Sequence, residues 1–182
     1  MARAVFLDRD GVLNAAIVRN GKPFPPASVE ELQIFPEAPE ALAALKQRGF
    51  LLIVITNQPD VARGTQTKSS VEAIHAALTA ALPLDAVFTC YHDDADRCDC
   101  RKPKPGMLLR AFQDFKIDAS LSYMVGDRWR DIDAGASAGC KTVWIDYNYA
   151  ERAPASRVDA RVASVAEAAA WIINDRTIRI AQ

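Results

Sequence analysis

The sequence predicts an α/β domain in which a parallel sheet carries helices on both faces. Short apolar runs alternate with stretches of helical periodicity, and this alternation is typical of βαβ units with right-handed crossovers. The length of 182 residues corresponds to one domain, and apolar residues make up 50% of the chain, which is ordinary for a protein with one core. We therefore expect residues 1–182 to form a single domain.

Five runs rich in apolar residues predict buried parallel strands. Val, Ile, Leu and Phe dominate them, as expected for strands that are covered on both faces. Ligands bind beyond the carboxyl ends of such strands, so the residues that follow each run are candidates for a site. The runs are residues 4–7, 51–55, 86–89, 122–125 and 141–145.

Five stretches with apolar residues three or four positions apart predict helices. The N-cap region of the second stretch is expected at Thr67, Lys68, Ser69 and Ser70. Ser164 with Glu167 has the spacing of a capping box at the last stretch. Pro105 is expected at the first helical position of the third stretch, where a backbone N–H is not needed. The stretches are residues 36–48, 67–81, 105–115, 131–138 and 165–173.

The long connection over residues 14–35 predicts a loop, because it holds Gly21 and several prolines. We expect this loop, with Arg19, Lys22 and Phe24, to cover part of a site. The other intervals between strands are filled by the predicted elements, which leaves no room for a separate cap domain. No element is assigned after residue 173.

Composition and charge exclude several classes of protein. Lys and Arg number 22 and Asp and Glu number 23, so the net charge is −1 and a nucleic-acid footprint is not indicated. No apolar run approaches the ~20 residues that cross a bilayer, and the first residues lack a signal-peptide pattern. We expect a cytoplasmic protein that binds neither nucleic acid nor membrane, with a monomer as the default state.

Three aspartates follow two of the predicted strands. Asp8 and Asp10 follow residues 4–7, and Asp127 follows residues 122–125. Each alone is more readily a solvated turn residue than a functional one. At a shared sheet edge they could bind Mg²⁺, and one carboxylate could attack an electrophile while another transfers a proton.

Two further segments carry groups that suit a phosphate. Thr56 and Asn57 end the second strand, where a hydroxyl and an amide can donate hydrogen bonds; the alternative is a turn or N-cap role. Arg101 and Lys102 precede a predicted helix, where basic side chains suit an anion; the alternative is a solvated basic loop.

A cluster of sulfur and imidazole groups predicts a structural zinc site. Cys90, His92, Cys98 and Cys100 lie within eleven residues, and a Cys₃His set closes a tetrahedral Zn²⁺ site. A disulfide or a core histidine is the less favoured alternative, since the segment is rich in aspartate and a reducing compartment is expected. Cys140 lies apart and is expected to be a packed free thiol.

Taken together these motifs resemble, in order and in position, the four motifs of the haloacid dehalogenase superfamily. The resemblance spans about residues 4–146. Two segments are similar to the branch that contains the D-glycero-D-manno-heptose 1,7-bisphosphate phosphatases and the histidinol-phosphate phosphatases, in which the same Cys/His loop precedes the basic segment. The motifs are Asp8-Arg9-Asp10-Gly11, Thr56, Lys102 and Gly126-Asp127, and the two segments begin at Asp8 and Cys100.

The resemblance implies a Rossmann-like fold and a Mg²⁺-dependent phosphomonoester hydrolase. It implies that Asp8 is the nucleophile, forming an aspartyl-phosphate, and that Asp10 is the general acid and base. It implies Mg²⁺ binding by Asp8, the backbone carbonyl of Asp10, and Asp127. Thr56 and Lys102 are implied to stabilise the transferring phosphoryl group. Phosphoryl transfer depends mainly on positioning the reactants and neutralising their negative charge.

Four side chains are candidates to bind a second phosphate or the sugar hydroxyls of a phosphorylated sugar: Asn57, Arg63, Arg101 and Arg128. Residues 61–64 and 104–107 resemble the heptose bisphosphate type, and this resemblance implies removal of the 7-phosphate of D-glycero-D-manno-heptose 1,7-bisphosphate. The alternatives are a phosphatase of histidinol phosphate or of another sugar phosphate, and a non-catalytic, zinc-stabilised binding protein. A zinc-ribbon nucleic-acid module is disfavoured by the acidic Cys/His loop.

Overall fold

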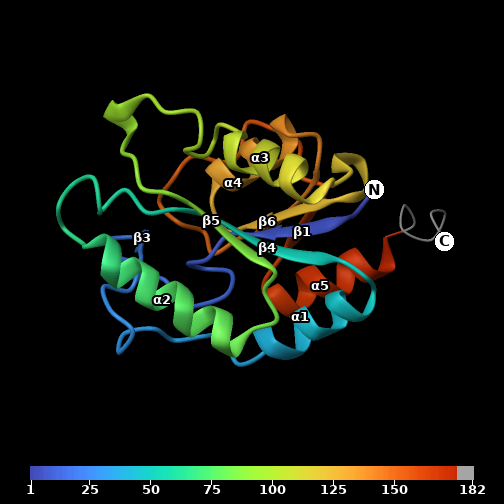
Figure 1. Ribbon diagram of the computed structural model, residues 1–182, viewed down its shortest axis with the longest axis horizontal. Helices are drawn as coiled ribbons and strands as arrows, with labels where there is room; N and C mark the ends of the chain where they lie inside the picture. The colour runs from blue at the N-terminus through green and yellow to red at the C-terminus, as the bar shows by residue number, and fades with distance from the viewer. Residues whose placement is uncertain (176–182) are drawn as a thin grey trace.

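The computed structural model describes residues 1–175 and contains the predicted parallel sheet (Figure 1). Its six strands follow the order β5-β4-β1-β6-β7-β8, and every neighbouring pair is parallel. The bounds are β1 Ala4–Leu7, β4 Leu51–Asn57, β5 Ala86–Cys90, β6 Tyr123–Gly126, β7 Lys141–Ile145 and β8 Ala160–Val162. The five predicted strands are thus confirmed, and the edge strand β8 is an addition.

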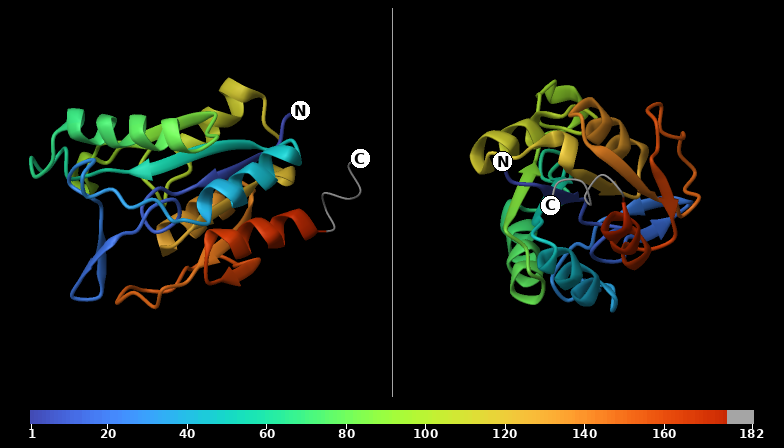
Figure 2. Two further views of the ribbon diagram at one scale, coloured as in Figure 1. Left: turned by 90° about the horizontal axis from the view of Figure 1, so that it is seen from below. Right: turned by 90° about the vertical axis from the view of Figure 1, so that its right-hand side faces the viewer.

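Five helices cover the two faces of the sheet, as predicted. α1, α2 and α5 contribute to the hydrophobic cluster on one face, and α3 and α4 to the cluster on the other (Figures 1 and 2). Their bounds are α1 Ala38–Gln47, α2 Lys68–Ala81, α3 Gly106–Phe115, α4 Trp129–Ser137 and α5 Val165–Asn174. Short 3₁₀ turns lie at Asp94–Asp96 and Ala119–Leu121.

Strand β1 shows why these runs are apolar throughout. All four of its side chains are fully buried, with Val5 and Leu7 in one cluster and Ala4 and Phe6 in the other. Successive side chains of a strand point to opposite faces, so a strand covered on both sides has no position for a polar residue. The polar residues therefore begin where the strand ends.

The predicted N-caps of two helices are confirmed. The Thr67 hydroxyl accepts the Ser70 N–H at 3.1 Å, which satisfies one of the free donors of α2. The Ser164 hydroxyl accepts the Glu167 N–H at 3.2 Å at the start of α5. The carboxylate of Glu167 accepts the N–H of Ala163, one residue before the N-cap, so the capping box is shifted by one position.

The prediction of a loop over residues 14–35 is wrong in part. Strands β2 (Ile17–Arg19) and β3 (Lys22–Phe24) form an antiparallel hairpin. Its turn consists of Asn20 and Gly21, which both have positive φ values of 50° and 71°. Two such residues between antiparallel strands make the tight turn that Asn-Gly sequences favour.

Two predicted helix starts also need correction. Pro105 is the N-cap of α3 and not its first helical residue, because the helix begins at Gly106. Helix α4 begins at Trp129, two residues before the predicted Asp131, so that Asp131 lies inside its first turn. Residues 176–182, for which no element was assigned, lie outside the described residues.

The described part of the chain has no cap domain and no helix long and apolar enough to cross a bilayer. The carboxyl ends of β1, β4 and β6 are instead flanked by two short segments. One is the β2–β3 hairpin and the other is the segment that follows β5, drawn in light green in Figure 1. These segments form the walls of the site described below.

At Gly135, helix α4 lies closer to the sheet than any residue with a Cβ would allow. A Cβ at Gly135 would lie 2.4 Å from the Cβ of Met124 in β6 and 3.2 Å from a methyl group of Thr142 in β7. Gly135→Ala should therefore lower the free energy of unfolding by about 1–3 kcal/mol, although alanine is the better helix former. Urea unfolding measures this change.

The matched control is Ser137→Ala on the exposed side of the same helix. It should change the free energy of unfolding by less than about 0.5 kcal/mol. A Gly135→Ala variant as stable as the wild type would show that the close contact does not constrain α4.

Candidate active site

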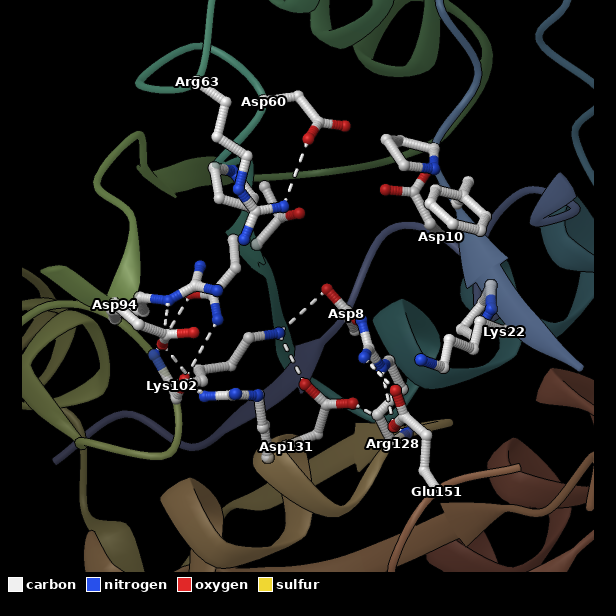
Figure 3. Close-up of a pocket in the computed structure, with 18 residues that line it drawn as sticks. Asp8, Asp10, Lys22, Asp60, Arg63, Asp94, Lys102, Arg128, Asp131 and Glu151 are labelled. Carbon is white, nitrogen blue, oxygen red and sulfur yellow. Dashed lines mark hydrogen bonds and ion pairs between the residues drawn. The ribbon is translucent and has the colours of Figure 1, made fainter. Parts of the chain in front are cut away.

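A pocket of about 230 Å³ lies at the carboxyl ends of the central strands (Figure 3). The structure brings eight of the predicted residues into its lining. They are Asp8, Asp10, Thr56, Asn57, Arg63, Arg101, Lys102 and Arg128. Asp127 lies outside this lining, buried beside Asp8.

The ammonium group of Lys102 forms the centre of the pocket floor (Figure 3). Its side chain is 2% exposed, and its Nζ lies 2.8 Å from Asp8 Oδ1 and 2.6 Å from Asp131 Oδ1. It also donates a hydrogen bond of 2.6 Å to the carbonyl of Ile55 in β4. The two carboxylates raise the pKa of Lys102 against the effect of its burial, so the group is charged.

Three buried carboxylates meet beside this lysine. Oxygens of Asp8, Asp127 and Asp131 lie within 4.8 Å of one another. Burial raises the pKa of Asp8 to about 6, with Asp131 adding to the rise and Lys102 opposing it. Burial, with Asp8 and Asp131, also raises the pKa of Asp127 well above its usual range.

This carboxylate set fits a divalent cation. In residues 1–175, neither oxygen of Asp127 has a hydrogen bond of normal geometry, and Tyr149 offsets the rise in its pKa only in part. When ionised, the three carboxylates carry more negative charge than the single ammonium of Lys102 can compensate. Mg²⁺ prefers carboxylate oxygens and keeps positions for water or phosphate, so the donor set matches that ion.

Asp10 leaves the same strand but its side chain takes different partners. Arg9 Nη2 and Gln58 Nε2 donate to Asp10 Oδ2 at 2.9 and 3.0 Å, and Asn14 Nδ2 donates to Oδ1 at 3.0 Å. Arg9 is itself fully buried, and its Nη1 lies 3.2 Å from Nε2 of His75 in α2. Burial lowers the pKa of His75 to about 4, so this imidazole is neutral at pH 7 and can accept from Arg9.

Thr56 and Asn57 occupy the last two positions of β4. The Thr56 hydroxyl accepts from Gln58 Nε2 at 2.9 Å, so one glutamine amide contacts both Thr56 and Asp10. The Asn57 amide donates to the Lys102 carbonyl and accepts from the Lys102 N–H, both at 3.1 Å. Asn57 therefore lines the pocket while its amide holds the backbone of Lys102.

The predicted arginines lie around the rim, each against a carboxylate. Arg63 makes two parallel hydrogen bonds to Asp93, at 2.7 and 2.9 Å, and lowers the pKa of that carboxyl to about 2. Arg101 donates to Asp94 at 2.8 Å. Arg128 pairs with Glu151 through both Nε and Nη2.

The four predicted zinc ligands converge on one point outside the pocket. Tetrahedral Zn²⁺ with Zn–S bonds of about 2.3 Å places sulfur atoms about 3.7 Å apart. The Sγ atoms of Cys90, Cys98 and Cys100 lie 3.0–3.7 Å apart, and Nδ1 of His92 is 3.3 Å from Cys100 and 3.7 Å from Cys90. Burial, with the neighbouring thiols, raises the pKa of Cys90, so a cation is needed to hold it as a thiolate.

The Cys/His segment also contacts the pocket directly. Arg101 follows the last cysteine, and its Nη1 donates to the carbonyl of His92 at 3.3 Å. Asp94, in the 3₁₀ turn between the ligands, contacts Arg101 at 2.8 Å and Arg130 at 3.4 Å. The conformation of this segment therefore sets where both arginines lie.

Among the residues that sequence reasoning missed, three lie against the central carboxylates: Asp131, Gln58 and Arg9. Asp131 joins Asp8 and Asp127, and its spacing of four from Asp127 was an available signal, because it fits a turn followed by the first turn of a helix. Gln58 and Arg9 hold Asp10, but no pattern marks them. Their contacts follow only from the approach of β4 and α2 to the end of β1.

Comparisons with known proteins agree with this geometry. Residues 16–139 match the haloacid dehalogenase-like hydrolases. The D-glycero-beta-D-manno-heptose-1,7-bisphosphate 7-phosphatase of Pasteurella multocida is 37% identical over 152 residues, which cover 78% of this chain and 79% of that protein. The protein of the same name from Escherichia coli K12 is 36% identical over 151 residues, which cover 76% of each chain.

A solved structure extends the similarity to nearly the whole chain. It is the D,D-heptose 1,7-bisphosphate phosphatase from B. bronchiseptica, complexed with magnesium and phosphate, with a TM-score of 0.76 and 28% identity. The match covers 94% of this chain and 98% of that one. By its sequence, its fold and the arrangement of its pocket, this chain belongs to the haloacid dehalogenase-like hydrolases.

Proposed function

We propose that this protein is a Mg²⁺-dependent phosphatase that removes the 7-phosphate of D-glycero-β-D-manno-heptose 1,7-bisphosphate. The observation that carries the proposal is the buried ammonium of Lys102 between Asp8 and Asp131 on the floor of an arginine-rimmed pocket. A phosphate placed there meets a carboxylate beside fixed positive charge. The substrate and its anomer are taken from the names of the similar proteins.

Asp8 is the proposed nucleophile. Its carboxylate oxygen attacks phosphorus, the bond between phosphorus and the sugar oxygen breaks, and an aspartyl-phosphate remains. Two anions would repel each other on approach, and Lys102, 2.8 Å from Asp8, reduces that repulsion. Thr56, buried at the end of the neighbouring strand, is the proposed donor of a further hydrogen bond to the phosphoryl oxygens.

Asp10 is the proposed general acid and base. In the first step it gives a proton to the departing sugar oxygen, and in the second it takes a proton from the water that attacks the aspartyl-phosphate. Water attack releases inorganic phosphate and restores Asp8. Arg9, Asn14 and Gln58 fix the Asp10 carboxylate at the pocket wall between these steps.

Asp8, Asp127 and the backbone carbonyl of Asp10 are the proposed ligands of Mg²⁺, and Asp131 completes the surrounding carboxylates. When bound, the ion supplies positive charge that offsets the phosphate and the buried aspartates. Asp131 also accepts the Arg128 N–H at 2.9 Å, so the start of helix α4 holds this carboxylate in place.

Structural zinc in the Cys/His cluster completes the proposal. The segment from Cys90 to Cys100 has only one fully buried residue, Cys90, and cannot fold around an apolar core of its own. A Cys₃His set leaves no open position for catalysis, so the proposed role is to order the segment that carries Arg101 and Lys102. The sugar hydroxyls are proposed to meet Asn57, Arg63, Arg101 and Arg128 at the rim.

Phosphate release from a panel of substrates tests the activity. The panel contains both anomers of heptose 1,7-bisphosphate, histidinol phosphate and simple sugar phosphates, each with Mg²⁺. We expect kcat/KM for the β-bisphosphate to exceed that for the other compounds by roughly 100-fold, which is about 2.7 kcal/mol of transition-state binding. A preference for histidinol phosphate would replace the proposed substrate and keep the mechanism.

The control for the mechanism is Asp8→Asn, which keeps the size of the side chain and removes the nucleophile. Turnover should be lost while circular dichroism and zinc content stay unchanged. Near wild-type activity of this variant would exclude Asp8 as the nucleophile. Inactivity of the wild type on the whole panel, with both metals bound, would favour the non-catalytic binding protein.

The raised pKa of Asp8 predicts a pH-dependent effect of Mg²⁺ on stability. Without the ion, native Asp8 has a pKa of about 6 and holds its proton more tightly than in the unfolded chain, so its contribution to stability is present below about pH 4 and lost as the pH rises through 6. The loss is up to about 3 kcal/mol. Mg²⁺ binds the ionised form, so it should raise Tm more at about pH 7.5 than at about pH 5.

Thermal unfolding with and without Mg²⁺ at the two pH values measures this difference. Asp8→Asn does not titrate and should show a smaller difference between the two pH values. An equal Mg²⁺ effect at both values in the wild type would contradict ion binding at these carboxylates.

Removal of one thiol tests the zinc site. Cys98→Ser should reduce the bound zinc well below one atom per chain and lower Tm, because the segment loses the metal that orders it. Cys140→Ala is the matched control: this thiol is buried away from the cluster, and burial raises its pKa to about 12. Metal analysis of protein purified without chelator that found no zinc in the wild type would exclude the site.

A further inference from the structure

The β2–β3 hairpin is a fixed wall of the pocket. The N–H of Ala150 donates to the Gly21 carbonyl at 2.9 Å, and a Cβ on Gly21 would lie 3.0 Å from the Cβ of Ala150. Beyond β3, the amide of Gln66 donates to the carbonyls of Pro26 and Ala27, both at 3.1 Å. The hairpin is therefore held on both sides of β3.

Strand β3 presents three consecutive residues to the pocket: Lys22, Pro23 and Phe24. In Figure 3, Lys22 and Lys102 enter from opposite sides of the pocket, and Asp8 lies between them. Lys22 is exposed, whereas Lys102 is 2% exposed at the floor. The pocket thus has one lysine beside the proposed nucleophile and a second at its open side.

The charges that line the pocket single out Lys22. Six basic and six acidic side chains line it, so the lining is neutral as a whole. Five of the basic groups pair with carboxylates: Arg63, Arg101, Lys102, Arg128 and Arg130. Within residues 1–175, Lys22 is the lining cation that forms no ion pair.

We propose that Lys22 binds the phosphate of the substrate that is not cleaved, and so determines the preference for a bisphosphate. This inference rests on the proposed function. A second phosphate adds about two negative charges to the substrate. A pocket lining that is neutral as a whole can stabilise them only through a cation that has no carboxylate partner. To bind this phosphate, the arginines at the rim would have to break their ion pairs with carboxylates, whereas exposed Lys22 has no ion pair to break.

The position of Lys22 supports this assignment over a role at the reacting phosphate. The phosphate beside Asp8 already meets Lys102, which lies on the floor with Asp8 and Asp131. A sugar that extends from Asp8 toward the open side carries its other phosphate away from the floor, along the wall formed by β3. Phe24, 39% exposed on the same wall, offers an apolar surface for the sugar ring.

Paired kinetics on two substrates test the proposal. Heptose 1,7-bisphosphate and heptose 7-phosphate differ only in the second phosphate. Lys22→Met should lower kcat/KM for the bisphosphate about tenfold or more, mainly through KM, because one charged hydrogen bond is lost. The same variant should change kcat/KM for the monophosphate less than about threefold.

Two variants serve as controls. Lys22→Arg keeps the charge and should retain most of the bisphosphate preference. Lys68→Met removes the same charge from helix α2, outside the pocket lining, and should leave both substrates unaffected. An effect of Lys68→Met equal to that of Lys22→Met would mean that only the overall charge matters, and would overturn the proposal.

The remaining outcomes separate this inference from the proposed function. Equal losses on both substrates in Lys22→Met would overturn the assignment to the second phosphate, and so would no loss on either. A wild type that cleaves both heptose phosphates equally well would overturn it too, while the phosphatase activity stands. A wild type inactive on both would overturn the proposed function, and the assignment of Lys22 with it.

Discussion

The buried ammonium group of Lys102 is the interaction on which the site depends. It contacts Asp8 after β1, the Ile55 carbonyl in β4 and Asp131 in α4, and Asn57 holds its backbone. An ammonium taken from water is stabilised only when its partners surround it, and loss of one partner leaves a buried charge that costs about 3–5 kcal/mol. Four segments far apart in the sequence are thereby held in one arrangement.

Three carboxylates lie around this one lysine, and two glycines of the backbone leave the space that they need. A Cβ on Gly11 would lie 2.0 Å from an oxygen of Asp127, and one on Gly126 would lie 2.1 Å from the Cβ of Asp131. The two glycines thus admit carboxylates that any side chain would displace. Burial, together with the neighbouring carboxylates, raises the pKa values of Asp8 and Asp127, so their negative charge is stable only against a cation or protons.

The sequence predicted the central sheet and the polar residues at its edge for one reason. A strand covered on both faces holds few polar residues, so Asp8, Thr56 and Asp127 mark where strands end or are about to end. Asp131 and Gln58 were missed because their partners depend on how α4 and β4 pack. The hairpin was missed although Asn20-Gly21 signalled its turn, because the prolines of the segment were read as breakers. Strand β8 has three residues at a sheet edge, too few for an apolar pattern.

The two walls of the pocket show how residues 1–175, which contain no cap domain, shape a site. Neither the hairpin nor the Cys/His segment has an apolar core, so each depends on other interactions for its conformation. Ala150 and Gln66 hold the hairpin, and the other wall is held by the proposed zinc, for which the segment supplies three thiols and an imidazole. Both walls carry basic side chains, Lys22 on one and Arg101 on the other. Lys22 forms no ion pair in the described residues, so the charge of the hairpin wall can change without disturbing Lys102 and the aspartates, whereas Arg101 directly precedes Lys102 in the chain and is tied to the floor.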